Sequence, residues 1–127
     1  MINNGKNSRQ DSCTQKSDKH TSQIKILELN DKFRQTGVGG MTLMSRGIRV
    51  LDPTIRQTII NAIRVFDQFT VDNDPYGTHD SGSVNVEGNL IFWKIDYYDL
   101  DLICGSPDPT DLNVTKRIMT IMLAEEY

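Results

Sequence analysis

The sequence is poor in several features that define whole classes of proteins. It has two cysteines, Cys13 and Cys104. This number excludes a disulfide scaffold, the pair lacks zinc-ligand spacing, and we expect both thiols to be free. The longest apolar run near the end, residues 118–124, is broken by Thr120 and is far shorter than the roughly 20 residues that cross a bilayer. The start of the chain is polar and has no signal-peptide core, so we expect a cytoplasmic protein with no membrane association.

Motifs for cofactors and calcium are also missing. The glycine-rich residues 37–40 follow a predicted helix and precede a predicted strand, which is the reverse of the order in phosphate-binding loops. A calcium loop starting at Asp72 would require a polar ligand where Tyr76 stands and a glutamate where Ser83 stands. The sequence therefore predicts no cofactor.

Charge is distributed unevenly along the chain. The net charge is -3, but residues 71–102 alone hold one lysine against seven acidic residues. Residues 1–20 contain almost no large apolar side chain, and such a segment cannot bury enough surface to offset the entropy of ordering it. We therefore predict a disordered polar tail over residues 1–20 and a single domain over residues 21–127.

Three segments carry signals of a helix. Apolar residues recur at helical spacing from Thr21, and the glycines from Gly37 end that pattern. Residues 53–68 form the clearest amphipathic pattern, with Asp52 in the capping position and a proline after it. The pattern of residues 111–125 predicts a third, heavily buried helix.

Strand signals fall between these helices. Residues 41–45 alternate apolar and polar side chains, and residues 48–50 could continue that strand. Residues 83–86 and 90–98 flank a short turn and predict a hairpin. One face of its second strand is expected to carry Ile91, Trp93, Ile95 and Tyr97. The predicted fold class is α+β, with a small, mainly antiparallel sheet packed against about three α-helices.

The segment 71–102 gathers the residue types that chemistry uses. His79 is the only histidine outside the tail, and Asp80 and Asp96 are carboxylates that could orient it or share a metal with it. His79, Asp80 and Asp96 are therefore the candidates for a catalytic or a metal site, in a metal-assisted or acid–base hydrolytic enzyme. No nucleophile in an elbow motif accompanies them.

The same segment is a candidate surface for a partner. Acidic and aromatic side chains lie on it, and both types serve at interfaces with basic proteins. The predicted partner is a protein, such as one with a basic nucleic-acid-binding groove. The residues expected to bind it are Asp72, Asp74, Tyr76, Asp80, Tyr98, Asp99 and Asp101.

A third hypothesis is a DNA-associated accessory protein. Arg46, Arg49, Arg56 and Arg64 could form a modest basic patch. The acidic pI of about 5.3 argues against general affinity for phosphate backbones, and no nucleic-acid-binding motif is present. The binding-protein hypothesis is therefore favoured over both the enzyme and direct nucleic-acid binding.

Five runs of the sequence resemble a small bacterial family catalogued as domain of unknown function 3768. They are LNDxFRxTGVGG (29–40), FDxFTxDNDPYGxHD (66–80), IFWKIDYYD (91–99), GSPDP (105–109) and TIMLAEEY (120–127). The resemblance implies a bacterial cytosolic protein, often encoded on a plasmid or phage, and supplies no activity or catalytic residue. That setting suggests a counter-defence factor of the anti-restriction or anti-CRISPR type.

Overall fold

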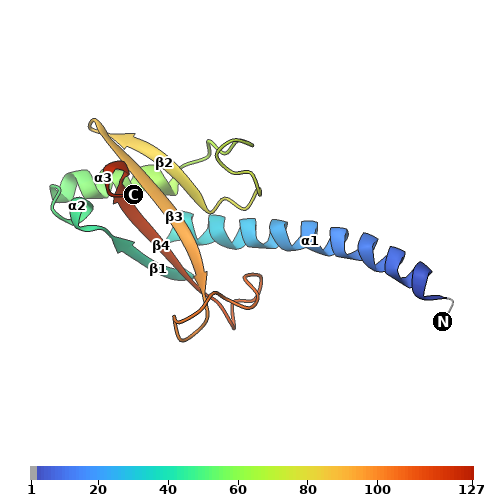
Figure 1. The fold of residues 1–127 in the computed structure, drawn as a ribbon. Coiled ribbons are helices and arrows are strands. Elements are labelled where there is room, and N and C mark those ends of the chain that lie inside the picture. The colour runs from blue at the N-terminus through green and yellow to red at the C-terminus, as the bar shows by residue number, and fades with distance from the viewer. Residues whose placement is uncertain (1–2) are drawn as a thin grey trace.

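The computed structural model describes the backbone of residues 3–127 and the side chains of residues 19–127. Its helices and strands form an α+β fold, as predicted (Figure 1). The elements are α1 (Asn3–Thr36), β1 (Gly40–Met44), α2 (Arg46–Arg49), α3 (Pro53–Arg64), β2 (Ser81–Val86), β3 (Asn89–Tyr98), β4 (Lys116–Leu123) and the 3₁₀ helix η1 (Ala124–Glu126).

The described strands form one four-stranded sheet in the order β1-β4-β3-β2. β2 and β3 form the predicted hairpin, and β3 pairs with β4 in the antiparallel sense. β1 pairs with β4 in the parallel sense, with Met41 opposite Ile118. The sheet is thus mixed but mainly antiparallel, and β1 and β2 are its two edges.

β4 corrects the prediction of a helix over residues 111–125. The apolar positions near residue 120 fit a period of 3.6 and a period of two equally well, and a short apolar run cannot distinguish them. Arg117, Met119 and Ile121 alternate as buried side chains toward the helices. The strand is stable because its main chain bonds to β1 on one side and to β3 on the other, and both partners are distant in sequence.

The segment after β1 corrects a second prediction. Residues 48–50 do not continue the strand, because Ser45 caps the short helix α2 by accepting a hydrogen bond from Ile48 N. Ile48 is then fully buried. The predicted start of α3 is confirmed, since Asp52 accepts a bond from Thr54 N at 2.8 Å, but α3 ends at Arg64, before the predicted end at residue 68.

α1 ends where predicted, at Thr36, and Gly37 adopts a left-handed φ of 76°. The predicted start near Thr21 is wrong, because the helical backbone begins at Asn3, and the N-terminal half of the helix extends away from the sheet (Figure 1). Residues 1–2 and the side chains of residues 3–18 lie outside the described part of the chain. The disordered tail over residues 1–20 therefore stays a prediction.

The core lies between the helices and one face of the sheet. The expected face of β3 is confirmed, because Ile91, Trp93 and Ile95 are at most 3% exposed. They pack with a set of buried apolar side chains from α1, α2, α3, β2 and β4. Burying each of these large side chains contributes about 1.5–3 kcal/mol.

One buried amide connects the helical layer to the sheet. The Asn30 Nδ2 donates to Thr78 O at 2.9 Å and to the Tyr97 hydroxyl at 2.7 Å. Its Oδ1 accepts from Arg117 Nε at 2.8 Å, and Arg117 Nη2 donates to Pro109 O at 2.7 Å. Asn30 and Arg117 thereby hold α1, β3, β4 and two loops at one point.

The carboxylate of Glu126 fastens the C-terminal end to the opposite end of the sheet. It accepts hydrogen bonds from the Ser45 hydroxyl, from Leu123 N at 2.8 Å and from Gly47 N at 2.9 Å. These bonds, that from Ser45 first, lower the pKa of Glu126 below its ordinary value. The charged form of Glu126 therefore stabilises the fold.

Replacing Asn30 with alanine should lower the free energy of unfolding by about 3 kcal/mol, because it leaves the Arg117 Nε and the Thr78 carbonyl buried without these partners and removes one of the two hydrogen-bond partners of the Tyr97 hydroxyl. Urea unfolding followed by circular dichroism measures the loss. Asn113→Ala is the matched control, since Asn113 is exposed. A loss in Asn30→Ala no larger than in the control would contradict this role.

Replacing Glu126 with glutamine should lower the stability at neutral pH and have no effect in strong acid. The lowered pKa means that the stabilisation is complete above the ordinary value of 4.5 and disappears as the pH falls through the lowered value. Urea midpoints measured from neutral to acidic pH test this. Glu125→Gln is the matched control, because it makes the same change of charge on the neighbouring exposed residue.

Candidate functional site

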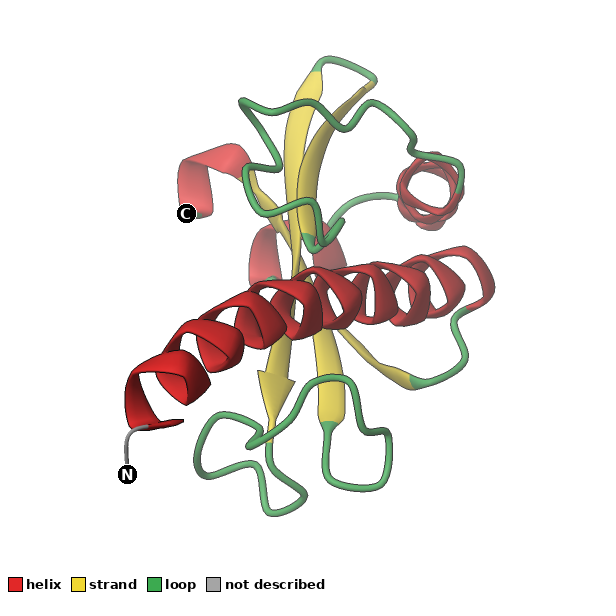
Figure 2. Cartoon of the chain, turned by 90° about the vertical axis from the view of Figure 1, so that its right-hand side faces the viewer, coloured by secondary structure: helices red, strands yellow, loops and turns green. Residues whose placement is uncertain are grey.

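Two acidic loops lie beside the sheet. Residues 65–80 lead into β2, whose first residue pairs with Lys94, and residues 99–115 connect β3 to β4 at the end of the sheet where β3 stops (Figure 1). α1 crosses between them (Figure 2). The loops contain no lysine or arginine and eight aspartates: Asp67, Asp72, Asp74, Asp80, Asp99, Asp101, Asp108 and Asp111. We call these two segments the acidic loops.

The buried pair Asn30 and Arg117 positions both acidic loops. Asn30 holds the first loop through Thr78 O, and Arg117 holds the second through Pro109 O. Arg117 is 1% exposed, and its guanidinium lies 5.1 Å from the centre of the Tyr97 ring. Because both anchoring side chains are buried, the backbone of each loop is held in a fixed position at Thr78 and Pro109, and the carboxylates of the loops project from this fixed backbone.

The first acidic loop uses one of its carboxylates for its own structure. Asp74 is 8% exposed and accepts hydrogen bonds from Thr78 N and His79 N, each at 3.2 Å. Asp72 is exposed, and Tyr76 is 74% exposed. Of the predicted partner-binding residues on this loop, Asp72 and Tyr76 therefore face solvent, whereas Asp74 is turned inward.

His79 is placed differently from the arrangement that the sequence suggested. Its Nδ1 lies 2.9 Å from Asp31 Oδ1, and its Nε2 lies 3.8 Å from Asp74 Oδ2. The ring also stacks on Phe69, with 3.7 Å between ring centroids. Both ring nitrogens therefore face carboxylates, and the imidazole fastens this loop to α1.

The predicted trio of His79, Asp80 and Asp96 is not assembled as a site. Asp96 lies on the face of β3 opposite to the helices and pairs with Lys94 at 3.4 Å. Among the described residues, no group of three or more histidine, cysteine, aspartate or glutamate side chains is arranged to hold a metal ion. The exposed, free Cys104 is on the other acidic loop.

Asp80 belongs instead to the edge of the Asn30 network. The Tyr97 hydroxyl lies 3.4 Å from Asp80 Oδ2. Burial first, and then the neighbouring charge of Asp74, raise the pKa of Asp80, and burial raises the pKa of Tyr97 to about 12. Asp80 is therefore a half-buried carboxylate that is only partly available to a partner.

The second acidic loop also divides its carboxylates between structure and surface. Asp99 accepts a hydrogen bond from Ile103 N at 3.0 Å, and hydrogen bonds from Thr110 lower the pKa of Asp108. Asp101 is exposed and forms no ion pair with a described residue. The predicted Tyr98 is half-buried on β3. Asp101 is thus the freest of the predicted carboxylates here.

Sequence reasoning missed a group of exposed apolar side chains on this loop. They are Leu100 at 50%, Leu102 at 42%, Ile103 at 79% and Leu112 at 55% exposure. Leu102 has a left-handed φ of 60°, which a leucine rarely adopts. A signal was present: Leu100 and Leu102 alternate with aspartates just before a loop rich in glycine and proline, where no core-facing strand can continue.

The arginines of the DNA-binding hypothesis lie on α2 and α3. Arg46 and Arg49 are on α2, and Arg56 donates to Arg49 O at 2.7 Å. Arg64 is at the other end of α3, close to Gly37. These side chains are therefore spread along the helical layer and do not gather at the acidic loops.

No described helix combines the length and the apolar content that crossing a membrane requires. Comparison with curated proteins and with solved structures finds no match for the chain. The profile of a family described as "Protein of unknown function (DUF3768)" matches residues 44–126, which include both acidic loops and the whole sheet beyond β1. This match covers more than half of the chain, and the protein therefore belongs to the DUF3768 family.

Proposed function

We propose that this is a small binding protein that inhibits or modulates a basic protein partner through its two acidic loops. The observation that carries the proposal is the set of eight aspartates on the two loops that flank α1, none of which pairs with a described lysine or arginine. Such a field attracts a positively charged surface and speeds its association.

The apolar side chains on the second acidic loop support the same proposal. Charge steers and selects a partner, whereas desolvated apolar anchors supply much of the lasting affinity. Leu102 and Ile103 stand exposed beside Asp101, and the left-handed backbone of Leu102 costs about 1–2 kcal/mol. A fold that maintains such a strained, exposed apolar turn has a use for it at an interface.

The chemistry of the partner follows from the acidic loops. Carboxylates on a fixed frame compete with phosphate groups for the same lysines and arginines, so a protein with a basic nucleic-acid-binding groove fits best. The finer form of the proposal is a counter-defence factor of the anti-restriction or anti-CRISPR type. Its support is the plasmid or phage setting that the resemblance to this family implies.

Reversing the free carboxylates should abolish partner binding. In the double variant Asp72→Lys/Asp101→Lys the net charge rises by four, but neither residue supports the fold, so the structure should be retained. The immobilised protein is incubated with nuclease-treated extract of its bacterial host, and each retained protein is identified and purified. The binding of each purified host protein to the wild type and to the double variant is then measured, with and without competing duplex DNA.

Glu87→Lys/Glu125→Lys is the matched control, because it makes the same change of charge at exposed positions outside the acidic loops. The proposal expects a partner that the control retains, that the acidic-loop variant loses and that DNA displaces. Equal retention by both variants, or no retained basic protein at all, would contradict it.

A further inference from the structure

The strand β2 is an edge of the sheet, and its main-chain groups divide into two sets. Ile95 N donates to Asp80 O at 2.7 Å, and bonded positions in an antiparallel pair recur at every second residue. Gly82 and Val84 therefore direct their main-chain groups toward β3. The pairing with β3 runs without a bulge from one end of β2 to the other.

The alternate residues Ser81, Ser83 and Asn85 direct their N–H and C=O groups away from the sheet. No described residue donates to or accepts from these outward groups. Natural sheets usually protect such an edge with lysine, proline, a bulge or a covering segment. β2 has none of the first three, its outer side chains are small, and its outward main-chain groups have no hydrogen-bond partner among the described residues.

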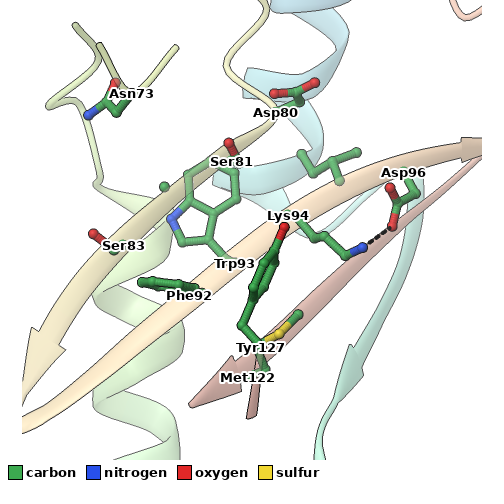
Figure 3. Close-up of a pocket in the computed structure, with 12 residues that line it drawn as sticks. Asn73, Asp80, Ser81, Ser83, Phe92, Trp93, Lys94, Asp96, Met122 and Tyr127 are labelled. Atoms are coloured by element: carbon green, nitrogen blue, oxygen red, sulfur yellow. Dashed lines mark ion pairs between the residues drawn. The ribbon is translucent and has the colours of Figure 1, made fainter. Parts of the chain in front are cut away.

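A pocket of about 540 Å³ lies over β2 and β3 and extends to Met122 and Tyr127 (Figure 3). Ser81 and Ser83 line it from β2, and Asn73 of the first acidic loop lies on the far side of the strand. The rings of Phe92 and Tyr127, which meet edge to face at 5.7 Å, form its apolar wall. An extended segment bound at β2 could place an alternate side chain in this pocket.

The charges around the pocket select among possible occupants. Asp80 and Asp96 line it, and its one lysine, Lys94, already pairs with Asp96. A second copy of this chain, bound antiparallel at β2, would bring its own Asp80 and Glu87 against the same acidic surroundings. A basic segment would be attracted there, whereas a second copy would be repelled.

We propose that β2 accepts an extended segment of a basic partner as a fifth strand, with an apolar side chain of that segment in the pocket beside Phe92 and Tyr127. This inference rests on the proposed function, because it assigns a binding mode to the same class of partner. Main-chain bonds would fix the register, and the acidic surroundings would favour lysine and arginine at the outer positions.

The test uses a short synthetic peptide in which lysine and valine alternate, and a second peptide with glutamate in place of lysine. Trp93 is the only tryptophan, and its indole lies against Gly82 of β2, so its fluorescence reports binding. Amide hydrogen exchange should show new protection at Ser81, Ser83 and Asn85. The amides of Gly82 and Val84 are protected beforehand and should not change.

Two variants at Ser83 separate main-chain pairing from side-chain contact. Ser83→Pro removes one outward N–H without touching the bonds to β3, and proline is tolerated on such an edge. Ser83→Val keeps the N–H. Proline should weaken binding of the lysine peptide by about tenfold, and valine should not. Unchanged exchange at the three outward amides, or equal binding of the glutamate peptide, would overturn the proposal.

A concentration-dependent dimer that Ser83→Pro dissolves would also overturn it, because the occupant would then be a second copy. The Ser83 variants leave every carboxylate in place. A host partner that is retained equally by Ser83→Pro and wild type would remove the strand-addition proposal alone. The opposite combination would remove the proposed function alone: the protein binds the lysine peptide, but the acidic-loop variant Asp72→Lys/Asp101→Lys still retains the host partner.

Discussion

The fold depends on one buried amide more than on any other polar group. Asn30 donates two hydrogen bonds and accepts one, and its partners lie 48, 67 and 87 residues away along the chain. An aspartate could not donate to the Thr78 carbonyl or the Tyr97 hydroxyl, and an apolar residue would leave the buried Arg117 with one contact fewer. The position therefore requires an amide, because the amide nitrogen donates hydrogen bonds and the amide oxygen accepts one.

Arg117 extends this constraint to the surface. Its buried charge has no carboxylate partner among the described residues. Arg117 Nε and Nη2 donate to the oxygens of Asn30 and Pro109, and the guanidinium lies over the Tyr97 ring, whereas Nη1 is buried without a hydrogen-bond partner. Because no aspartate pairs with Arg117, the aspartates of both loops are left for other uses. Some, such as Asp74, close their own turns, and others, such as Asp101, face solvent. The interior network and the acidic surface are thus two parts of one charge arrangement.

Local signals in the sequence were sufficient to predict the elements that depend only on neighbouring residues. The Asp52 cap and the β2–β3 hairpin were predicted, and the turn at Glu87 and Gly88 has the left-handed φ values that tight hairpins need. β4 was missed because its identity depends on β1 and β3, which the local apolar pattern does not encode. The acidic content of the site was also visible. The sequence did not reveal which of these carboxylates face solvent and which bond within the protein, because that depends on distant contacts such as the one between His79 and Asp31.

In the proposed mode of binding, the acidic loops and the β2 edge would provide complementary kinds of recognition at adjoining places. Charge acts over about 8–10 Å in physiological salt but carries little information about register. Main-chain pairing acts only at contact, and it fixes register and direction. Asp80 ends the first acidic loop and Ser81 begins β2, so a basic segment drawn to the loop arrives beside the unpaired edge.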